Sequence, residues 1–192
     1  RDPSTSLLKW HNKENIPESV RDMVLNRAEE IDPKKVDLIF TALESEDAKI
    51  IEPKMASQVP VISTAAAFRY EDDVPILIPG INDEHCEMLN IQKKNRKWNG
   101  FIAPLPNCTT TGMAITLKPL MDEMGLESVF MTSMQALSGA GRSPGVIALD
   151  IMDNVIPYIP KEEEKVQVET TKILGKFNGD SIINASIKVS CT

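Results

Sequence analysis

The chain has 192 residues, in which 21 Lys and Arg stand against 28 Asp and Glu, so its formal net charge is −7. This acidic balance excludes a general phosphate-backbone binder, because nucleic-acid affinity comes mainly from clustered Lys and Arg. Hydrophobic residues make up 42% and charged residues 26%, proportions typical of a soluble globular protein, and no apolar run approaches the roughly 18 residues that span a bilayer.

Runs typical of strands alternate with runs typical of helices along the first part of the chain. Pro17 suits the first turn of a helix, and Pro75 inside a strand-like run indicates an edge strand. The expected elements, in order, are a helix over 17–30, a strand over 36–42, a helix over 45–57 with Pro53 as its kink or boundary, strands over 60–64 and 74–78, a helix over 81–95 and a strand over 101–105.

The second part begins with the clearest helix, expected over 108–124, where apolar residues recur at helical spacing. The remaining expected elements are a strand over 128–134, a helix over 146–154, a charged helix over 161–176 and a long strand over 181–191. Alternating strands and helices with short connections predict an α/β fold. A domain boundary is expected near 104–107, which divides the chain into residues 1–106 and 107–192.

The positions of the cysteines and glycines exclude several kinds of site. Cys86, Cys108 and Cys191 are odd in number and form no C-x-x-C pair, which argues against a disulfide framework or a metal site and favours a reducing, cytoplasmic setting. None of the nine glycines precedes Gly80, so no phosphate-binding glycine loop is expected in the residues before it. The chain begins at Arg1 rather than Met, and we expect it to be a fragment.

The segment PNCTTTG (106–112) carries the chemistry. Cys108 follows an expected strand and opens the helix over 108–124. The free N–H groups and the dipole of a helix start favour the nucleophilic thiolate, and the same N–H groups can hold an oxyanion formed at an attacked carbonyl. The alternative is a buried structural cysteine, since cysteine is among the most buried residue types.

The segments PNCTTTG, TSMQALSGAG (132–141) and EEEKVQVETTKILGK (162–176) together resemble aspartate-semialdehyde dehydrogenases in order and spacing. SGAGRSPGV and LDIMDNVIPYI resemble the archaeal and fungal branch of that family, and the upstream segment STAAAFRYEDDVPILIPGIN resembles its arginine-bearing segment. The resemblance implies the remainder of a Rossmann-like NADP-binding domain over 1–106, followed by the start of an α+β catalytic and dimerisation domain over 107–192.

The resemblance also implies residue roles. Cys108 matches the nucleophile that attacks the C4 aldehyde and forms, in turn, a thiohemiacetal and a thioester, which phosphate cleaves to an acyl phosphate. In the cell the reaction runs in the reductive direction, from 4-phospho-L-aspartate to the semialdehyde, for lysine, threonine and methionine synthesis. Gln135 matches a glutamine that orients the substrate; without the motif it would read as a polar residue ending a strand.

The substrate and phosphate contacts implied are Glu162 for the substrate amine, Lys165 and Arg69 for the phosphate, and Asn107 beside the nucleophile. Two alternatives stand beside them. Glu162, Lys165, Glu169 and Lys172 follow a 3-4-3 spacing that also suits a solvated, salt-bridged stripe. Arg69 stands beside acidic residues and also suits a surface ion pair.

For the cofactor, Ser138 and Gly139 match the turn beside the NADP nicotinamide, and Leu43 matches a loop covering the dinucleotide. The implied partners are the substrate and phosphate, with a homodimer or homotetramer as the assembly and neither nucleic acid nor membrane. The rivals are another acyl reductase of the superfamily, such as an N-acetyl-glutamyl-phosphate or malonyl-CoA reductase, and a non-catalytic fragment. His11 and His85 match no catalytic position, so the 192 residues alone are expected not to turn over substrate.

Overall fold

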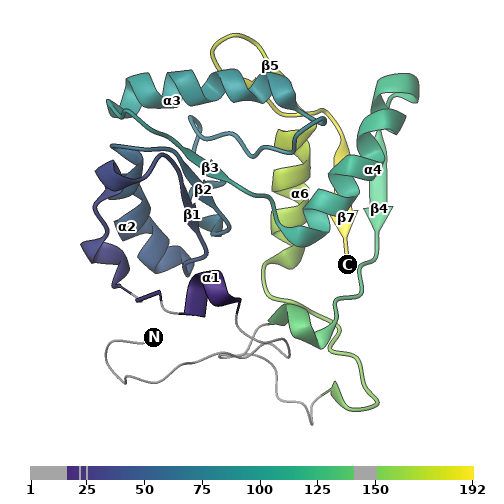
Figure 1. Cartoon of the computed structure of the whole chain (residues 1–192). Coiled ribbons are helices and arrows are strands. Elements are labelled where there is room, and N and C mark those ends of the chain that lie inside the picture. The colour runs from purple at the N-terminus through teal and green to yellow at the C-terminus, as the bar shows by residue number, and fades with distance from the viewer. Residues whose placement is uncertain (1–16, 22, 25, 141–150) are drawn as a thin grey trace.

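The computed structural model describes residues 17–21, 23–24, 26–140 and 151–192. One half of the molecule holds a three-stranded parallel sheet in the order β1 (Ile39–Thr41), β2 (Val61–Ser63), β3 (Ile102–Pro104). Parallel strands need crossover connections, and these contain α2 (Ser45–Ala56) and α3 (Met88–Arg96). Figure 1 shows both helices beside this sheet.

Among the described residues, the rest of the chain contains two longer helices and two strand pairs; Figure 1 labels both helices. Helix α4 runs over Cys108–Met124 and α6 over Glu162–Ile173, and they pack against each other. Strand β4 (Ser128–Met131) pairs in parallel with β7 (Lys188–Cys191), while β5 (Lys176–Phe177) and β6 (Ile182–Ile183) form an antiparallel pair. The short elements are α1 (Glu18–Arg21), η1 (Ala28–Glu30), η2 (Pro33–Lys35), η3 (Ala66–Phe68), η4 (Asp83–Glu87) and η5 (Leu137–Ala140).

The register of the first sheet brings its carboxyl ends to one level. Thr41 lies opposite Ser63, and Ser63 lies opposite Pro104. The ladder continues one residue further, because the Leu105 N–H donates to the Ser63 carbonyl at 2.7 Å. The chain then enters α4 three residues later, so the start of α4 follows directly from the carboxyl edge of a parallel sheet, where ligands bind in such folds.

Residues 74–78 form no strand, and the expectation of one is wrong. Pro75 has no N–H to give to a sheet, and the side chain of Asn82 takes up two neighbouring backbone groups instead. Its Oδ1 accepts from the Ile78 N–H at 2.9 Å, and its Nδ2 donates to the Ile76 carbonyl at 2.8 Å. The buried extended segment joins two cores, because Val74 packs with the α2 side and Ile76 with the α4–α6 side.

Three other expectations need correction. The helix over 17–30 is reduced to α1 and η1, and the helix over 81–95 begins as the 3-10 turn η4. The long strand over 181–191 is two short strands, β6 and β7, that pair in different sheets. Most of the helix expected over 146–154, and most of the segment SGAGRSPGV, lie outside the described residues.

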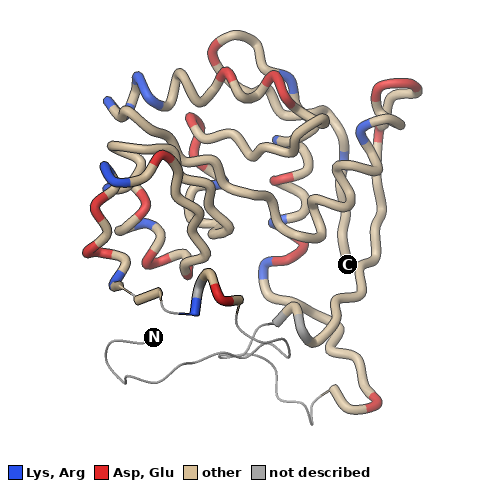
Figure 2. Tube along the Cα trace, in the orientation of Figure 1, with Lys and Arg blue, Asp and Glu red and all other residues tan. Residues whose placement is uncertain are grey.

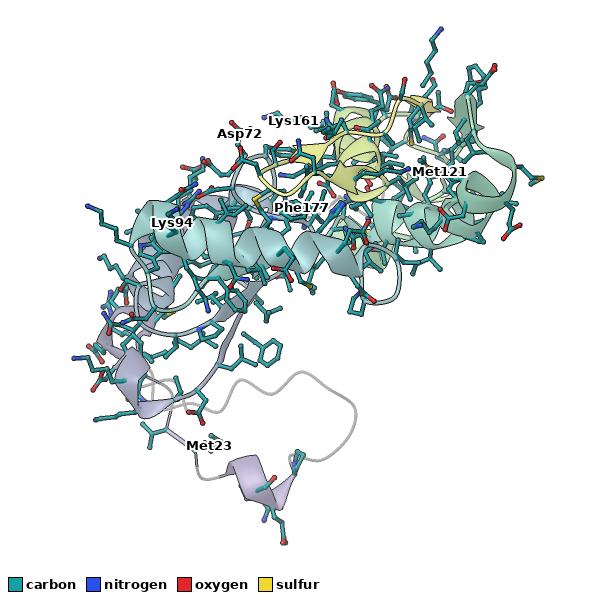
Figure 3. All side chains as sticks on the ribbon, turned by 90° about the horizontal axis from the view of Figure 1, so that it is seen from above. Met23, Asp72, Lys94, Met121, Lys161 and Phe177 are labelled. Atoms are coloured by element: carbon teal, nitrogen blue, oxygen red, sulfur yellow. The ribbon has the colours of Figure 1, made fainter. Side chains whose placement is uncertain are left out.

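The first described residues stand apart from the rest. Viewed from above, α1 and Met23 project away from the body of the chain (Figure 3), and Met23 and Val24 are 61% and 71% exposed. No helix in the described ranges is long and apolar enough to cross a membrane.

Candidate active site

Cys108 is the first residue of α4, and its side chain is an exposed free thiol. Asn107 caps the helix: its Oδ1 accepts from the N–H groups of Thr109 and Thr110 at 2.8 and 3.3 Å. Asn is among the preferred residues at this position. The exposed thiol contradicts the alternative of a buried structural cysteine.

Glu162, in the first turn of α6, binds the residues on both sides of Cys108. Its Oε2 accepts from Asn107 Nδ2 at 3.0 Å, and its Oε1 accepts from Thr109 Oγ1 at 2.9 Å. The residue is 7% exposed. One carboxylate of α6 therefore fixes the start of α4 around the thiol.

Glu169, two turns further along α6, is fully buried and receives three hydrogen bonds. Its Oε2 accepts from the Asn107 backbone N–H at 2.7 Å. Its Oε1 accepts from Arg69 Nη1 at 3.0 Å and from Tyr70 Oη at 3.1 Å. Burial and the neighbouring Glu169 carboxylate raise the pKa of Tyr70 above its ordinary value.

Arg69 is buried, with 7% of its surface exposed. Besides its ion pair with Glu169, Nη2 donates to the Thr64 carbonyl at 3.0 Å. Its Nε has no hydrogen-bond partner among the described residues. Lys172, also on α6, donates to the carbonyls of Arg69 and Glu71 at 2.9 and 2.8 Å, and burial lowers its pKa to about 8.

The charged residues of α6 therefore do not form a solvated stripe. Both signs occur along this helix (Figure 2), but Glu162, Glu169 and Lys172 are buried, and Lys165 is half-buried. Nor is Arg69 in a surface ion pair. Both alternatives weighed for these residues are wrong, because this face of α6 packs against α4 and the segment at Arg69.

The remaining predicted site residues lie elsewhere. The side chain of Gln135 is exposed and lies against Gly139 in η5, where a Cβ would overlap Gln135 Nε2. Ser138 belongs to the same turn. Leu43, just after β1, is half-buried against the α2 core. Over the ranges that the structure describes, no hydrogen bond joins Gln135 or Leu43 to the group around Cys108, and no three His, Cys, Asp or Glu side chains could hold a metal ion.

Sequence reasoning missed Glu169, Tyr70, Thr109 and Lys172 as members of this group. Glu169 and Lys172 were noticed, but only as part of a periodic stripe. The signal that could have found them is the apolar residues beside that stripe: Val166 and Ile173, both fully buried, directly follow its two lysines. A helix with buried residues on adjacent faces cannot keep those charges in solvent.

Comparison with known proteins connects this geometry to a family. The pattern of the semialdehyde dehydrogenase NAD-binding domain matches residues 6–89, and that of the dimerisation domain matches residues 117–192. An aspartate-semialdehyde dehydrogenase of Archaeoglobus fulgidus is 49% identical over 186 residues, covering 95% of this chain and 53% of the relative. One from Saccharomyces cerevisiae is 36% identical over 180 residues, covering 90% and 49%.

A solved structure gives the same result. The aspartate semialdehyde dehydrogenase of Candida albicans with NADP superimposes with a TM-score of 0.79 at 32% identity, covering 95% of this chain and 54% of that one. The chain thus spans about half the length of the curated relatives it matches. A parallel-stranded nucleotide-binding part and a dimerisation part, in this order and with this identity, show that the chain belongs to the semialdehyde dehydrogenase family and to its aspartate-semialdehyde branch.

Proposed function

We propose that the protein containing this chain interconverts 4-phospho-L-aspartate and L-aspartate 4-semialdehyde, with NADP as cofactor, for lysine, threonine and methionine synthesis. The observation that carries the proposal is the exposed thiol of Cys108 at the start of α4, held from both sides by α6. The names of the relatives support the substrate, and the NADP in the Candida albicans structure supports the cofactor.

In the oxidative direction, the thiolate of Cys108 attacks the aldehyde carbon, and the carbonyl oxygen becomes an oxyanion. The N–H groups of Thr109 and Thr110 are taken by Asn107. The Cys108 N–H has no such partner within the described part of the chain and can donate to the oxyanion. The former aldehyde carbon loses a hydride, for which bound NADP would be the acceptor, and becomes the acyl carbon of a thioester on Cys108 Sγ. Phosphate then attacks the acyl carbon on Cys108 Sγ, the thiolate leaves, and an acyl phosphate forms.

The roles proposed for the other side chains follow from their places. Lys165 is half-buried, and its Nζ has no hydrogen bond or ion pair to any described residue, which leaves the ammonium available for phosphate. The Nε of Arg69 has no hydrogen-bond partner among the described residues, and its N–H is proposed for the same ligand. Glu162 supplies a carboxylate for the substrate amine beside Asn107, and Gln135 orients the substrate.

The cofactor fits two places in the chain. One is the turn η5, which holds Ser138 and Gly139 and matches the nicotinamide turn of the family; Gly139 there packs against the side chain of Gln135. Leu43 follows β1 at the carboxyl edge of the sheet, where dinucleotides bind in such folds. We place the boundary between the NADP-binding and catalytic domains at residues 106 and 107, where β3 passes into α4.

Assembly and location complete the proposal. The match to a dimerisation domain supports a homodimer or homotetramer. The three cysteines are all unpaired in the described structure, which supports a reducing, cytoplasmic setting.

A malonyl-CoA reductase activity is the second candidate, because a relative with that name, from Metallosphaera sedula, is 35% identical over 178 residues. The zwitterionic substrate favours the aspartyl reaction, since Glu162 and Lys165 offer opposite charges one helical turn apart. Measuring both reactions with the same preparation separates the two candidates.

The test is NADPH formation from aspartate semialdehyde and phosphate by the full-length protein. We expect turnover that Cys108→Ser abolishes and Cys86→Ser preserves. His85 is fully buried with both ring nitrogens hydrogen-bonded, so it is not the general base of the proposed reaction. A full-length protein without activity on either substrate would favour a non-catalytic role.

A further inference from the structure

The buried carboxylate of Glu169 joins two parts of the proposed site that lie far apart in sequence. One oxygen is bonded to the backbone N–H of Asn107, the residue before Cys108, and the other to the guanidinium of Arg69. Arg69 precedes Glu169 by 100 residues, and Asn107 precedes Glu169 by 62. No other described side chain binds both the segment of the nucleophile and the proposed phosphate residue.

The hydrogen bonds of Glu169 hold Asn107 and Arg69 in fixed positions relative to each other. The side chain of Glu169 is fully buried, and that of Arg69 is 8% exposed, so little water competes for either group. Hydrogen bonds to a charged group are stronger and shorter than neutral ones, and the bond to Asn107 is 2.7 Å. The Tyr70 hydroxyl adds a third bond to the carboxylate and restrains it further.

The backbone group that Glu169 binds also matters. An N–H at the start of a helix carries part of the positive end of the helix dipole. By accepting from Asn107, Glu169 holds the strand-to-helix turn in place, and it also puts a negative charge beside the start of α4, the helix that Cys108 opens.

We propose that Glu169 is a positioning residue: it sets the separation between the nucleophile Cys108 and the phosphate-binding Arg69. The inference rests on the proposed function, in which phosphate must meet the acyl group on Cys108. In it, Glu169 touches neither substrate nor cofactor, and acts only through Asn107 and Arg69.

Glu169→Gln in the full-length protein tests this, because the amide keeps the size of the side chain and loses the charge. The matched control is Glu164→Gln, the same change at an exposed position of the same helix. We expect kcat with saturating phosphate to fall about ten- to a hundred-fold in Glu169→Gln, the loss corresponding to a charge-assisted bond. The KM for NADP should stay within about twofold in both variants.

The second readout does not depend on turnover. Loss of the carboxylate removes a negative charge beside the start of α4, so iodoacetamide should label Cys108 severalfold faster near neutral pH in Glu169→Gln and at an unchanged rate in Glu164→Gln. A merely structural role would lower activity and expose all thiols alike. It would not speed one thiol while turnover falls.

The outcomes separate the two proposals. Unchanged kcat and unchanged labelling in Glu169→Gln overturn the positioning role while leaving the function in place. Faster labelling in a protein that turns over neither substrate supports the link from Glu169 to Cys108 and overturns the function. If Glu169→Gln does not fold, Glu169→Asp keeps the charge but is one methylene too short to reach both partners. It should then lower kcat, and normal kcat in it overturns the proposal.

Discussion

At the scale of single residues, the three cysteines differ in surroundings. Cys108 is exposed at the start of a seventeen-residue helix. Cys86 is exposed too, but partial desolvation and the carboxylates of Asp83 and Glu87 raise the pKa of its thiol. Cys191 is buried, and burial with the nearby acidic residues of α6 raises its pKa. Of the three, only Cys108 is both exposed and placed at the start of an α-helix.

We therefore predict that iodoacetamide labels Cys108 first, near neutral pH, in the full-length protein. The rate depends on the thiolate fraction and on access, and each of the other thiols lacks at least one of these. Peptide mass spectrometry after short exposure gives the three rates. Labelling of Cys86 at the rate of Cys108 would contradict the prediction.

A second residue-scale prediction concerns phosphate. Lys165→Gln should raise the KM for phosphate about ten- to a hundred-fold, because a charge-assisted bond to an anion contributes about 1.5–3 kcal/mol. Arg69→Gln should do the same and also lower kcat, since it releases Glu169. Initial rates in the oxidative direction at varied phosphate measure both effects.

The control for these two variants is Lys94→Gln, an exposed position on α3, which should leave the KM for phosphate unchanged. A normal phosphate KM in both Lys165→Gln and Arg69→Gln would remove both residues from the phosphate site.

At the scale of elements, close approach between the end of α2 and the start of β3 depends on one glycine. Gly100 is buried, and its N–H donates to the Ala56 carbonyl at 3.1 Å. A Cβ there would overlap the backbone carbonyl of Val59. The backbone of Val59 cannot rotate out of the way as a side chain can. Only glycine therefore fits at position 100.

Gly100→Ala is therefore predicted to lower the free energy of unfolding by about 1–3 kcal/mol, the range for overpacking. Gly112→Ala is expected to have the opposite effect. Gly112 lies inside α4 with nothing within 4 Å of an added Cβ, so the substitution should raise the free energy of unfolding by about 0.5–1 kcal/mol through helix propensity. Denaturant unfolding of the two variants gives both signs. Equal effects would mean that the Gly100 contact is not as close as described.

At the scale of the whole molecule, His85 links η4 to the chain just after α6, at Gly175. It is fully buried; its Nδ1 lies 2.9 Å from Asn82 Nδ2 and its Nε2 lies 3.2 Å from the Gly175 carbonyl. The amide of Asn82 is a donor, so Nδ1 accepts and Nε2 carries the proton. Burial lowers the pKa of His85 below its ordinary 6.5.

The lowered pKa of His85 predicts that the folded protein loses stability in acid. Between 6.5 and the lower folded pKa, the unfolded chain binds a proton that the folded chain does not, so stability falls as the pH drops below 6.5. The contribution approaches but does not exceed about 1.4 kcal/mol per pH unit. Urea unfolding at several pH values should show a shallower acid slope in His85→Gln than in the wild type, and parallel slopes would contradict the link.

Local patterns in the sequence were sufficient for much of this protein. The helix over 108–124 and the strands near 39–41, 61–63 and 102–104 follow from apolar periodicity and short runs of strand-forming residues, which act within a few residues. Cys108 could be placed at a helix start for the same reason. The motif resemblance then indicated the family and the other candidate site residues.

Only the tertiary structure determined which distant segments of the chain contact one another. The segment 74–78 has the composition of a strand, but its backbone groups are taken by Asn82, and its side chains divide between two cores. The charges of α6 suit a solvated helix by spacing alone, yet packing on α4 buries Glu162 and Glu169 against Asn107. Sequence spacing describes one element at a time, whereas burial of a charge depends on a partner that the fold brings from far along the chain.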